Sequence, residues 1–212
     1  VLLTYFVFIA LINAYNLIDG LDGLASGIGI VISLSFIFIF YRIYDYSIGI
    51  LAISVVAVLL GFLKYNLSKQ FRIFMGDTGS MVIGFILTFM AIRFLYIAGQ
   101  PNYNIQTAPV LLLFIFCIPV IDTISVFVIR LLNKKNPMHP DKNHLHHNFI
   151  KLGLTHVQTS ILLVIINVLF IVIGFLLRGL EINILFLIFL TLSISFVTIL
   201  RLLTIRITNQ TK

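Results

Sequence analysis

The chain has 212 residues, of which 60% are hydrophobic and only 10% are charged. A soluble domain carries about a quarter charged residues, so the composition excludes a water-soluble globular protein and indicates a single integral-membrane domain over residues 1–212. The one cysteine, Cys117, lies inside an apolar run, which excludes a disulfide framework. The net charge is +7, but no continuous basic surface stands clear of the apolar runs, which argues against nucleic acid as a partner.

Seven apolar stretches are each long enough to cross a bilayer, since about 20 such residues span a hydrocarbon core about 30 Å thick. Backbone polar groups cannot stay unpaired in hydrocarbon, so each span is predicted to be a helix. The sequence therefore predicts an all-α, polytopic membrane protein with seven transmembrane helices, at about 1–18, 24–41, 47–63, 80–98, 108–131, 159–177 and 183–203.

Lysine and arginine are divided unevenly between the two sets of loops, and this bias sets the orientation in the membrane. Arg42, Arg93 and Arg178 fall on one side. The other eleven fall on the opposite side or in the tail: Lys64, Lys69, Arg72, Arg130, Lys134, Lys135, Lys142, Lys151, Arg201, Arg206 and Lys212. We therefore predict an N-terminus outside, a C-terminus in the cytoplasm, and a basic inner face that suits membrane lipids and an anionic soluble substrate.

The acidic residues are also divided unevenly between the two predicted sides of the membrane. Two of the seven, Asp45 and Glu181, fall in short outer loops and are expected to be solvated. The other five lie on the predicted cytoplasmic side or in a helix that leads to it: Asp19, Asp22, Asp77, Asp122 and Asp141. Because ionisable groups at membrane depth are costly, they usually mark a site or a pathway.

The first polar cluster runs from residue 13 to residue 23, with the sequence NAYNLIDGLDG. Asn13, Asn16 and Asp19 recur every three residues, so on a helix they would share an arc of about 120°. Gly20 and Gly23 loosen the backbone where the chain turns back into the bilayer. The cluster offers carboxylate and amide oxygens that could bind a ligand. The alternative interpretation is an ordinary helix end followed by a polar turn.

The second cluster is the segment 74–80, with the sequence FMGDTGS, at the next predicted cytoplasmic turn. Gly76 and Gly79 permit a close backbone approach, and Asp77 is predicted near the positive N-terminal end of the following helix. Such a helix start with small hydroxyl residues is also a natural phosphate cradle. A plain helix cap at Asp77 is the alternative.

The third cluster is HPDKNHLHHN at 139–148, which holds four of the five histidines. If residues 144–152 are helical, His144 and His147 share one face with Asn148 and Lys151, and Leu145, Phe149 and Leu152 share the neighbouring face. His146 does not fit the polar face, so a simple helix does not account for the whole segment. A solvated histidine-rich loop and a tight zinc site are the alternatives.

Asp122 stands alone within the segment PVIDT. A position lining the same polar cleft as the three clusters is predicted for it. A buried structural hydrogen bond is the alternative.

Taken in order, the segments 13–25, 74–80 and 144–147 resemble the polyprenyl-phosphate N-acetylhexosamine-1-phosphate transferases of glycosyltransferase family 4. The histidine segment is similar to the N-acetylglucosaminyl branch rather than to the phospho-N-acetylmuramoyl-pentapeptide branch. The resemblance covers essentially the whole chain but only the later part of a ten- or eleven-helix fold. We therefore expect further helices and a cytoplasmic Asp-Asp pair before Val1, and we expect the 212 residues alone to be inactive.

The resemblance implies transfer of an N-acetylhexosamine-1-phosphate, here GlcNAc-1-phosphate, from a UDP-sugar to undecaprenyl phosphate, with release of UMP. It places the enzyme in the bacterial inner membrane with its active site facing the cytoplasm, in a cell-surface glycan pathway. The predicted metal ligands for Mg²⁺, or Mn²⁺ in its place, are Asn16 and Asp77. The predicted catalytic residues are Asp19, Asp22 and Asp77. Substrate binding is predicted for Asn13, Asp22, Gly23, Asp122, His144, His146 and His147.

Other functions account for fewer of these features. A cation transporter would carry polar residues through the full depth of the bilayer, whereas the outer halves of these spans are almost wholly apolar. A di-iron oxidase would need about eight histidines, and the chain has five. The sequence leaves open the muramoyl-pentapeptide branch, the identity of the amino sugar, and a homodimer.

Overall fold

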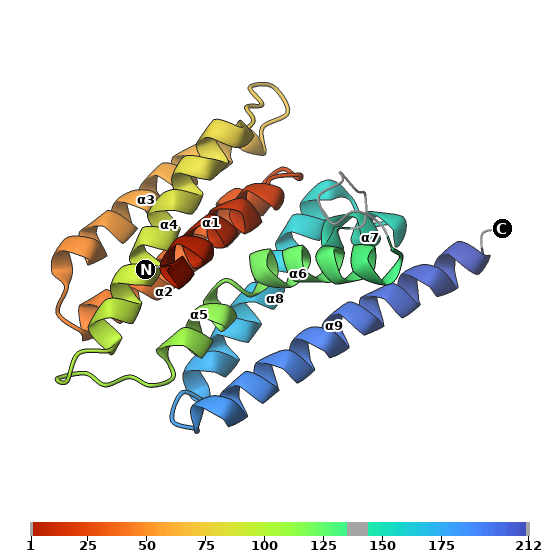
Figure 1. Cartoon of the computed structure of the whole chain (residues 1–212). Coiled ribbons are helices and arrows are strands. Elements are labelled where there is room, and N and C mark those ends of the chain that lie inside the picture. The colour runs from red at the N-terminus through yellow and green to blue at the C-terminus, as the bar shows by residue number, and fades with distance from the viewer. Residues whose placement is uncertain (1, 135–143, 211–212) are drawn as a thin grey trace.

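The computed structural model describes residues 2–134 and 144–210, and every regular element in these ranges is an α-helix (Figure 1). The predicted all-α class is therefore confirmed. The helices are α1 (Leu2–Leu17), α2 (Leu24–Arg42), α3 (Tyr46–Asn66), α4 (Gly76–Ala98), α5 (Ala108–Ile115), α6 (Cys117–Leu132), α7 (Leu145–Lys151), α8 (His156–Leu176) and α9 (Ile182–Gln210).

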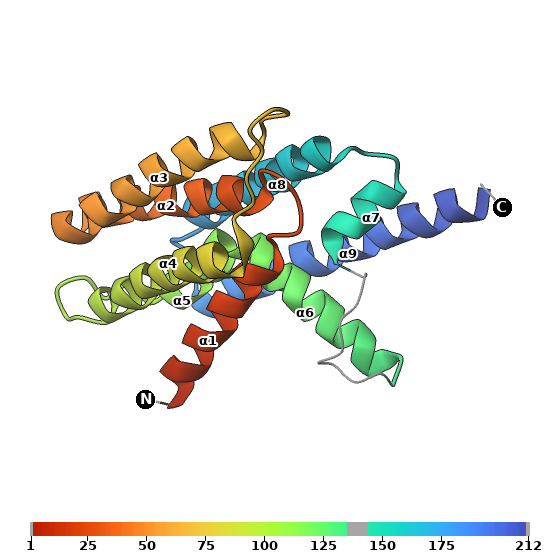
Figure 2. The same ribbon diagram turned by 90° about the horizontal axis from the view of Figure 1, so that it is seen from above.

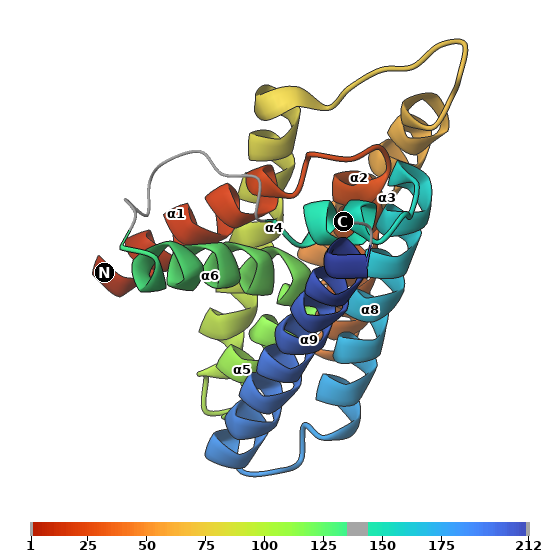
Figure 3. The same cartoon turned by 90° about the vertical axis from the view of Figure 1, so that its right-hand side faces the viewer.

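Five helices in the described ranges, α2, α3, α4, α8 and α9, are long and apolar enough to cross a membrane. The helices α5 and α6 make a sixth span only as a bent pair, because their axes differ by 83°. With 16 residues, α1 is about 24 Å long, which is shorter than a bilayer core. Seven spans are thus not confirmed, and the span predicted over 108–131 is divided at Phe116 into two helices. Figure 3 shows α1 and α6 lying across the direction of the long helices.

The break between α5 and α6 follows from Pro119. Proline has no N–H, so the carbonyl of Ile115, four residues earlier, cannot receive its helical hydrogen bond. Asn167 on α8, which is fully buried, supplies the missing donor: its Nδ2 donates to the Ile115 carbonyl at 3.2 Å, and its Oδ1 accepts from Ile118 N at 3.2 Å. A neighbouring helix thus satisfies the backbone that the break sets free, as a broken helix in a membrane requires.

The loops gather at the two ends of the bundle (Figures 1 and 2). One end, which we call the histidine end, comprises the loops 18–23 and 67–75 together with α7. The opposite end, which we call the tyrosine end, comprises the loops 43–45, 99–107 and 177–181. It carries Tyr41, Tyr44, Tyr46, Tyr96 and Tyr103, each at least partly exposed. Exposed tyrosines at helix ends are typical of a membrane–water interface.

At the tyrosine end, the predicted solvation of Asp45 is wrong. Arg93 on α4 reaches the turn between α2 and α3, and its Nε donates to Asp45 Oδ2 at 2.8 Å. The Asp45 side chain is only 14% exposed. Tyr103 reinforces this turn by donating from its hydroxyl to the Ile43 carbonyl at 2.8 Å.

The end of α1 is fixed by close packing against α4 and α2. A Cβ atom on Gly84 of α4 would lie 3.3 Å from the carbonyl oxygen of Ile12, so the two helices approach closely only because residue 84 is glycine. Tyr15 is fully buried and donates from its hydroxyl to the Ala25 carbonyl of α2 at 2.7 Å. The last turn of α1 therefore has a defined position beside the first turn of α4.

Candidate active site

Asn16 and Asp77 lie side by side at the histidine end. Asn16 is in the last turn of α1 and Asp77 is in the first turn of α4. The Asn16 amide nitrogen donates to Ser80 Oγ at 2.8 Å and to Asp77 Oδ1 at 3.4 Å. Asp77 is exposed. The two predicted metal ligands, 61 residues apart in the chain, are thus brought together by the packing of α1 against α4.

Asp19 does not continue the helical arc predicted for Asn13, Asn16 and Asp19. Because α1 ends at Leu17, Asp19 lies in the following turn, where its N–H donates to the Asn16 carbonyl at 3.1 Å. The Asn13 side chain is exposed and donates to the Ile9 carbonyl at 2.9 Å, one turn back along α1. The first cluster therefore contributes Asn16 and the turn after it to the site, and Asn13 stands apart.

The carboxylates at this end repel one another. The pKa of Asp19 is raised from 3.8 to about 6, chiefly by burial and also by the charges of Asp77 and Asp22, and a hydrogen bond from the Gly76 backbone offsets part of the rise. A group of acids whose charges disfavour one another is a place where a cation would be stabilised. Within residues 2–134 and 144–210, no three His, Cys, Asp or Glu side chains are grouped so as to hold a metal by themselves.

The pair fits the coordination habits of Mg²⁺. This ion takes octahedral oxygen ligands at about 2.1 Å, so that neighbouring ligands lie about 3 Å apart, and it commonly keeps waters and substrate phosphates besides one or two carboxylates. The separation of 3.4 Å between the Asn16 amide and Asp77 Oδ1 is close to that spacing. The Asn16 amide would present its oxygen after turning about its last side-chain bond.

Asp22 is held by an arginine that the sequence analysis did not assign to the site. Arg72 Nε donates to Asp22 Oδ1 at 3.1 Å, and Arg72 Nη2 bonds the other carboxylate oxygen. The guanidinium lies 4.9 Å from the centre of the exposed Phe74 ring. The carboxylate predicted to face the nucleotide is thus already paired, and Arg72 joins the group.

Asn66 ties the two turns of the histidine end together. It is buried, its Oδ1 accepts from the Gly23 N–H at 2.6 Å, and its Nδ2 donates to the Ile73 carbonyl at 2.8 Å. Gly23 has φ of 77°, which favours glycine at this turn. Its amide is engaged by Asn66, so in this structure Gly23 shapes the turn rather than offering its N–H to a substrate.

The histidine segment forms α7, as predicted for 144–152, with Leu145 and Phe149 buried. His146, which did not fit the predicted polar face, is 5% exposed. A Cβ atom on Gly20 would lie 3.0 Å from its ring, so the histidine packs onto the turn after α1 only because residue 20 is glycine. Burial lowers the pKa of His146 to about 4, which keeps the ring neutral at pH 7.

The imidazole rings of α7 and its cap form one group. The rings of His144 and His146 are nearly parallel with centroids 5.6 Å apart, and those of His146 and His147 are 4.3 Å apart. His139 and Asp141, from the same predicted cluster, lie outside the described residues. His144, His146 and His147 therefore lie together, next to the turn that follows α1.

Asp122 does not line an open cleft. Its side chain is 2% exposed, Oδ2 lies 2.8 Å from His144 Nδ1, and Oδ1 accepts from Leu145 N at 2.6 Å. The prediction that Asp122 lines the cleft is wrong, and the alternative of a buried structural hydrogen bond is confirmed.

Comparisons with known proteins agree with this arrangement. Residues 1–95 match the family model described as glycosyl transferase family 4. The chain is 37% identical over 170 residues to the probable undecaprenyl-phosphate N-acetylglucosaminyl 1-phosphate transferase of Bacillus subtilis (strain 168), covering 79% of the chain and 45% of the relative. The corresponding Yersinia pestis enzyme, undecaprenyl-phosphate alpha-N-acetylglucosaminyl 1-phosphate transferase, is 33% identical over 174 residues, covering 81% and 46%.

A third relative, the decaprenyl-phosphate N-acetylglucosaminephosphotransferase of Mycolicibacterium smegmatis (strain ATCC 700084 / mc(2)155), is 32% identical over 177 residues, covering 77% of the chain and 43% of the relative. The chain belongs to glycosyl transferase family 4. It spans about half the length of the curated relatives it matches.

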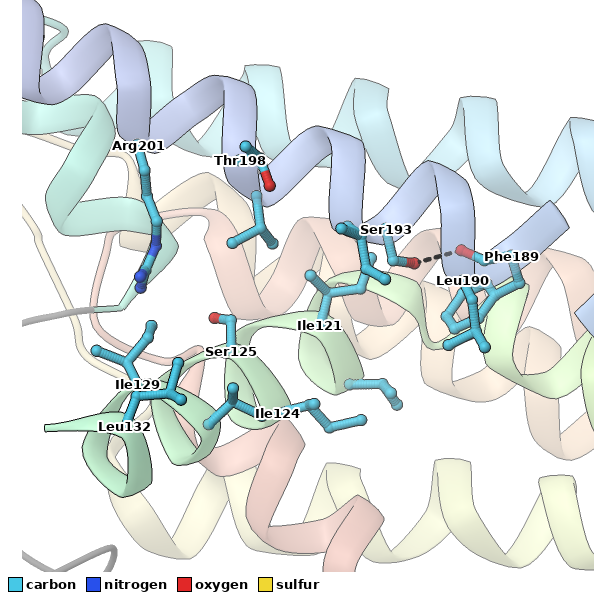
Figure 4. A pocket seen from close by; sticks show the side chains of 14 residues that line it. Ile121, Ile124, Ser125, Ile129, Leu132, Phe189, Leu190, Ser193, Thr198 and Arg201 are labelled. Carbon is cyan, nitrogen blue, oxygen red and sulfur yellow. Dashed lines mark hydrogen bonds between the residues drawn. The ribbon is translucent and has the colours of Figure 1, made fainter. Parts of the chain in front are cut away.

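The protein has a polar pocket at the histidine end and an apolar groove between α6 and α9. A pocket of about 350 Å³ at the histidine end is lined by three carboxylates and a guanidinium, those of Asp19, Asp22, Asp77 and Arg72. A separate groove of about 290 Å³ runs between α6 and α9 and is lined almost entirely by apolar side chains (Figure 4). Figure 4 shows Arg201 reaching from α9 towards the end of α6 near Ile129.

Proposed function

We propose that this family member transfers GlcNAc-1-phosphate from UDP-GlcNAc to undecaprenyl phosphate and releases UMP. The observation that carries the proposal is the juxtaposition of Asn16 and Asp77 at the edge of a pocket that also contains Asp19, Asp22 and Arg72. A diphosphate with its counter-ion needs such a mixture of oxygen ligands and positive charge. The matched relatives are named as transferases of N-acetylglucosaminyl 1-phosphate to undecaprenyl or decaprenyl phosphate.

In this reaction an oxygen of the lipid phosphate attacks the phosphorus that bears the sugar, and the bond from that phosphorus to the oxygen of UMP breaks. Positioning and charge neutralisation do most of the work in phosphoryl transfer. Mg²⁺, or Mn²⁺ in its place, would be held by Asp77 and Asn16 and would neutralise charge on the diphosphate oxygens. Asp19 would order this network, because it lies in the turn that follows Asn16.

The remaining polar groups would bind the two ends of the nucleotide sugar. Asp22 and Arg72, on the rim of the pocket, would contact the nucleotide, and the pairing between them would open to admit it. His144, His146 and His147 would hold the diphosphate from the α7 side, since imidazole N–H groups donate hydrogen bonds to phosphate oxygens. The lipid phosphate is already largely ionised near neutral pH, so no general base is assigned among these residues.

The groove between α6 and α9 suits the chain of the lipid acceptor. Its lining includes Ile121, Val128, Phe189 and Val197, and Arg201 supplies a positive charge at one end. A polyprenyl phosphate has the same pattern, an apolar chain with an anionic head. The chain would lie along the apolar wall, with the phosphate drawn towards the histidine end.

We also propose that the histidine end faces the cytoplasm of a bacterial inner membrane. The segments that the sequence predicts to be cytoplasmic hold eleven of the fourteen lysines and arginines, as expected for the inner side of a membrane, and these segments include the loops 18–23 and 67–75 of the histidine end. The exposed tyrosines would then mark the outer interface.

The test uses the protein expressed from its complete reading frame in bacterial membranes, supplied with radiolabelled UDP-GlcNAc, undecaprenyl phosphate and Mg²⁺. We expect labelled lipid and an equal amount of UMP, both abolished by EDTA and restored by Mg²⁺. Transfer from UDP-N-acetylmuramoyl-pentapeptide but not from UDP-GlcNAc would assign the protein to the other branch. Absence of labelled lipid from both donors, with correctly folded protein, would overturn the proposed function.

A further inference from the structure

The buried carboxylate of Asp122 has two partners, one on each oxygen. Oδ2 lies 2.8 Å from Nδ1 of His144, and Oδ1 accepts from the N–H of Leu145 at 2.6 Å. Asp122 is on α6, and the two residues it contacts are the cap and the first residue of α7. With 2% exposure, this carboxylate is shielded from water and from any substrate, so its influence is exerted through its partners.

The first partner fixes the proton position on His144. An ionised carboxylate can only accept hydrogen bonds, so Nδ1 must carry a hydrogen and donate it to Asp122. In the neutral ring, Nε2 then has no hydrogen and lies on the opposite edge of the imidazole from Asp122. Uptake of one proton from water at Nε2 turns this atom into a hydrogen-bond donor, and the carboxylate balances the charge that the ring acquires.

The second partner fixes the start of α7. The first amides of a helix have no partner within it, and a side-chain oxygen that accepts from one of them stabilises the helix start. Asp122 does this for Leu145 from another helix, α6, whose own start is held by Asn167. The orientation of α7, and with it the placement of His146 on Gly20, is thereby tied to α6.

We propose that Asp122 is a positioning residue that holds His144 as the Nδ1–H tautomer and aligns α7, so that the histidine cluster can bind an anion through Nε2 of His144. The anion would be the diphosphate of the nucleotide sugar, and in this respect the inference rests on the proposed function. The titratable groups beside His144 are Asp122, His146 and His147, and the charge of His156 acts on His146.

The variant Asp122→Asn separates the two roles. Its amide oxygen can still accept from Leu145, but its NH₂ group would face Nδ1 of His144 and place the hydrogen of the neutral ring on Nε2. The neutral amide also cannot balance a positive charge on the ring, so His144 would meet the anion without that charge. We expect kcat/KM for UDP-GlcNAc to fall roughly ten- to a hundred-fold, the range typical when the partner of a functional histidine is removed, mainly through KM, with little change in thermal midpoint. Asp122→Ala should lower both activity and thermal midpoint, and Asp122→Glu should recover part of the activity.

The control is Thr123→Val, the next residue on α6, whose hydroxyl donates only to the Pro119 carbonyl within the helix. It should leave kcat and KM close to those of the wild type. Wild-type kinetics in Asp122→Asn would overturn the proposal.

Nitrogen NMR on protein labelled with ¹⁵N-histidine tests the tautomer without reference to turnover. The His144 signal is identified by its loss in His144→Gln. We expect Nδ1–H in the wild type and Nε2–H in Asp122→Asn, and an Nε2–H wild-type ring would overturn the inference. If no sugar transfer occurs but the tautomers change as expected, the proposed function fails while the positioning role of Asp122 stands.

Discussion

The two ends of the bundle handle charge in different ways. At the tyrosine end, Asp45 is paired with Arg93 at 2.8 Å, and a tyrosine hydroxyl closes the same turn. At the histidine end, Asp19 and Asp77 lie close enough for their charges to disfavour each other, and Asp77 is exposed. The first arrangement pairs its carboxylate with a cation of the protein, whereas neither Asp19 nor Asp77 forms an ion pair with another of residues 2–134 and 144–210.

The difference teaches where stability and function lie in this fold. A local ion pair and partly buried hydrogen bonds hold the tyrosine end, so substitutions there should change stability and spare activity. Mutual repulsion at the histidine end costs stability in the ligand-free protein, so substitutions there should reduce activity without a matching loss of stability. Four experiments test this contrast.

The largest effect is expected for Asp77→Asn. Loss of the carboxylate would remove a charged metal ligand, and we expect UMP release to fall about a thousand-fold, since a catalytic metal contributes several kcal/mol to the transition state. The thermal midpoint without metal should not fall, because the substitution also removes repulsion with Asp19. Melting of helical circular dichroism with and without Mg²⁺ should show that the stabilisation by the metal is lost.

Asp45→Asn is the matched control at the other end, and it should retain transferase activity. Normal UMP release in Asp77→Asn would remove Asp77 from the metal site.

Gly20→Ala should produce a smaller loss. Its added Cβ atom would lie 3.0 Å from the His146 ring and would push the ring away from the turn. The ring would have to shift by a few tenths of an ångström. Because a displacement of about 1 Å near a reacting centre can cost about a hundred-fold in rate, we expect a roughly three- to ten-fold fall in kcat/KM. Gly61→Ala on α3 is the control, because an added Cβ atom there meets nothing within 4 Å. Equal kinetics for the two variants would show that the contact of His146 with Gly20 is unimportant.

Much of the histidine end could be predicted from the sequence because its features are local. Apolar runs indicated the helices, and glycine-rich turns next to Asn16 and Asp77 indicated that both residues lie at the same face. The bend between α5 and α6 was missed: Pro119 signals a weakened helix, but the partner that stabilises the break, Asn167, lies 48 residues further along. Arg72 was missed for the same reason, since its partner Asp22 is 50 residues earlier and no periodicity links the two.

A moderate effect of pH on the thermal midpoint is expected for the ligand-free protein. The pKa of Asp19 is about 6 in the folded state against 3.8 for the unperturbed group. Because the folded-state value is raised, the folded protein binds the proton more tightly than the unfolded chain does, and this stabilisation is lost as pH rises from about 4 through about 6. The thermal midpoint should therefore be a few degrees higher near pH 5 than near pH 7.5, after correction for other groups with Asp19→Asn. An identical pH dependence in Asp19→Asn would contradict this assignment.

The smallest effect is expected for the ion pair of the tyrosine end. The Arg93 side chain is 41% exposed, and pairs that contact water contribute at most about 1 kcal/mol. A double-mutant cycle of Arg93→Ala and Asp45→Ala, measured by unfolding in mixed micelles, should give a coupling of that size or less. All three variants should keep the kcat and KM of the wild type, because the pair lies at the opposite end of the bundle from Asp77. The two ends could be coupled only through an element they share, and α4 carries both Arg93 and Asp77. If breaking the pair raised KM for UDP-GlcNAc as much as Gly20→Ala does, such coupling would exist. The separation of stability from function between the two ends would then fail.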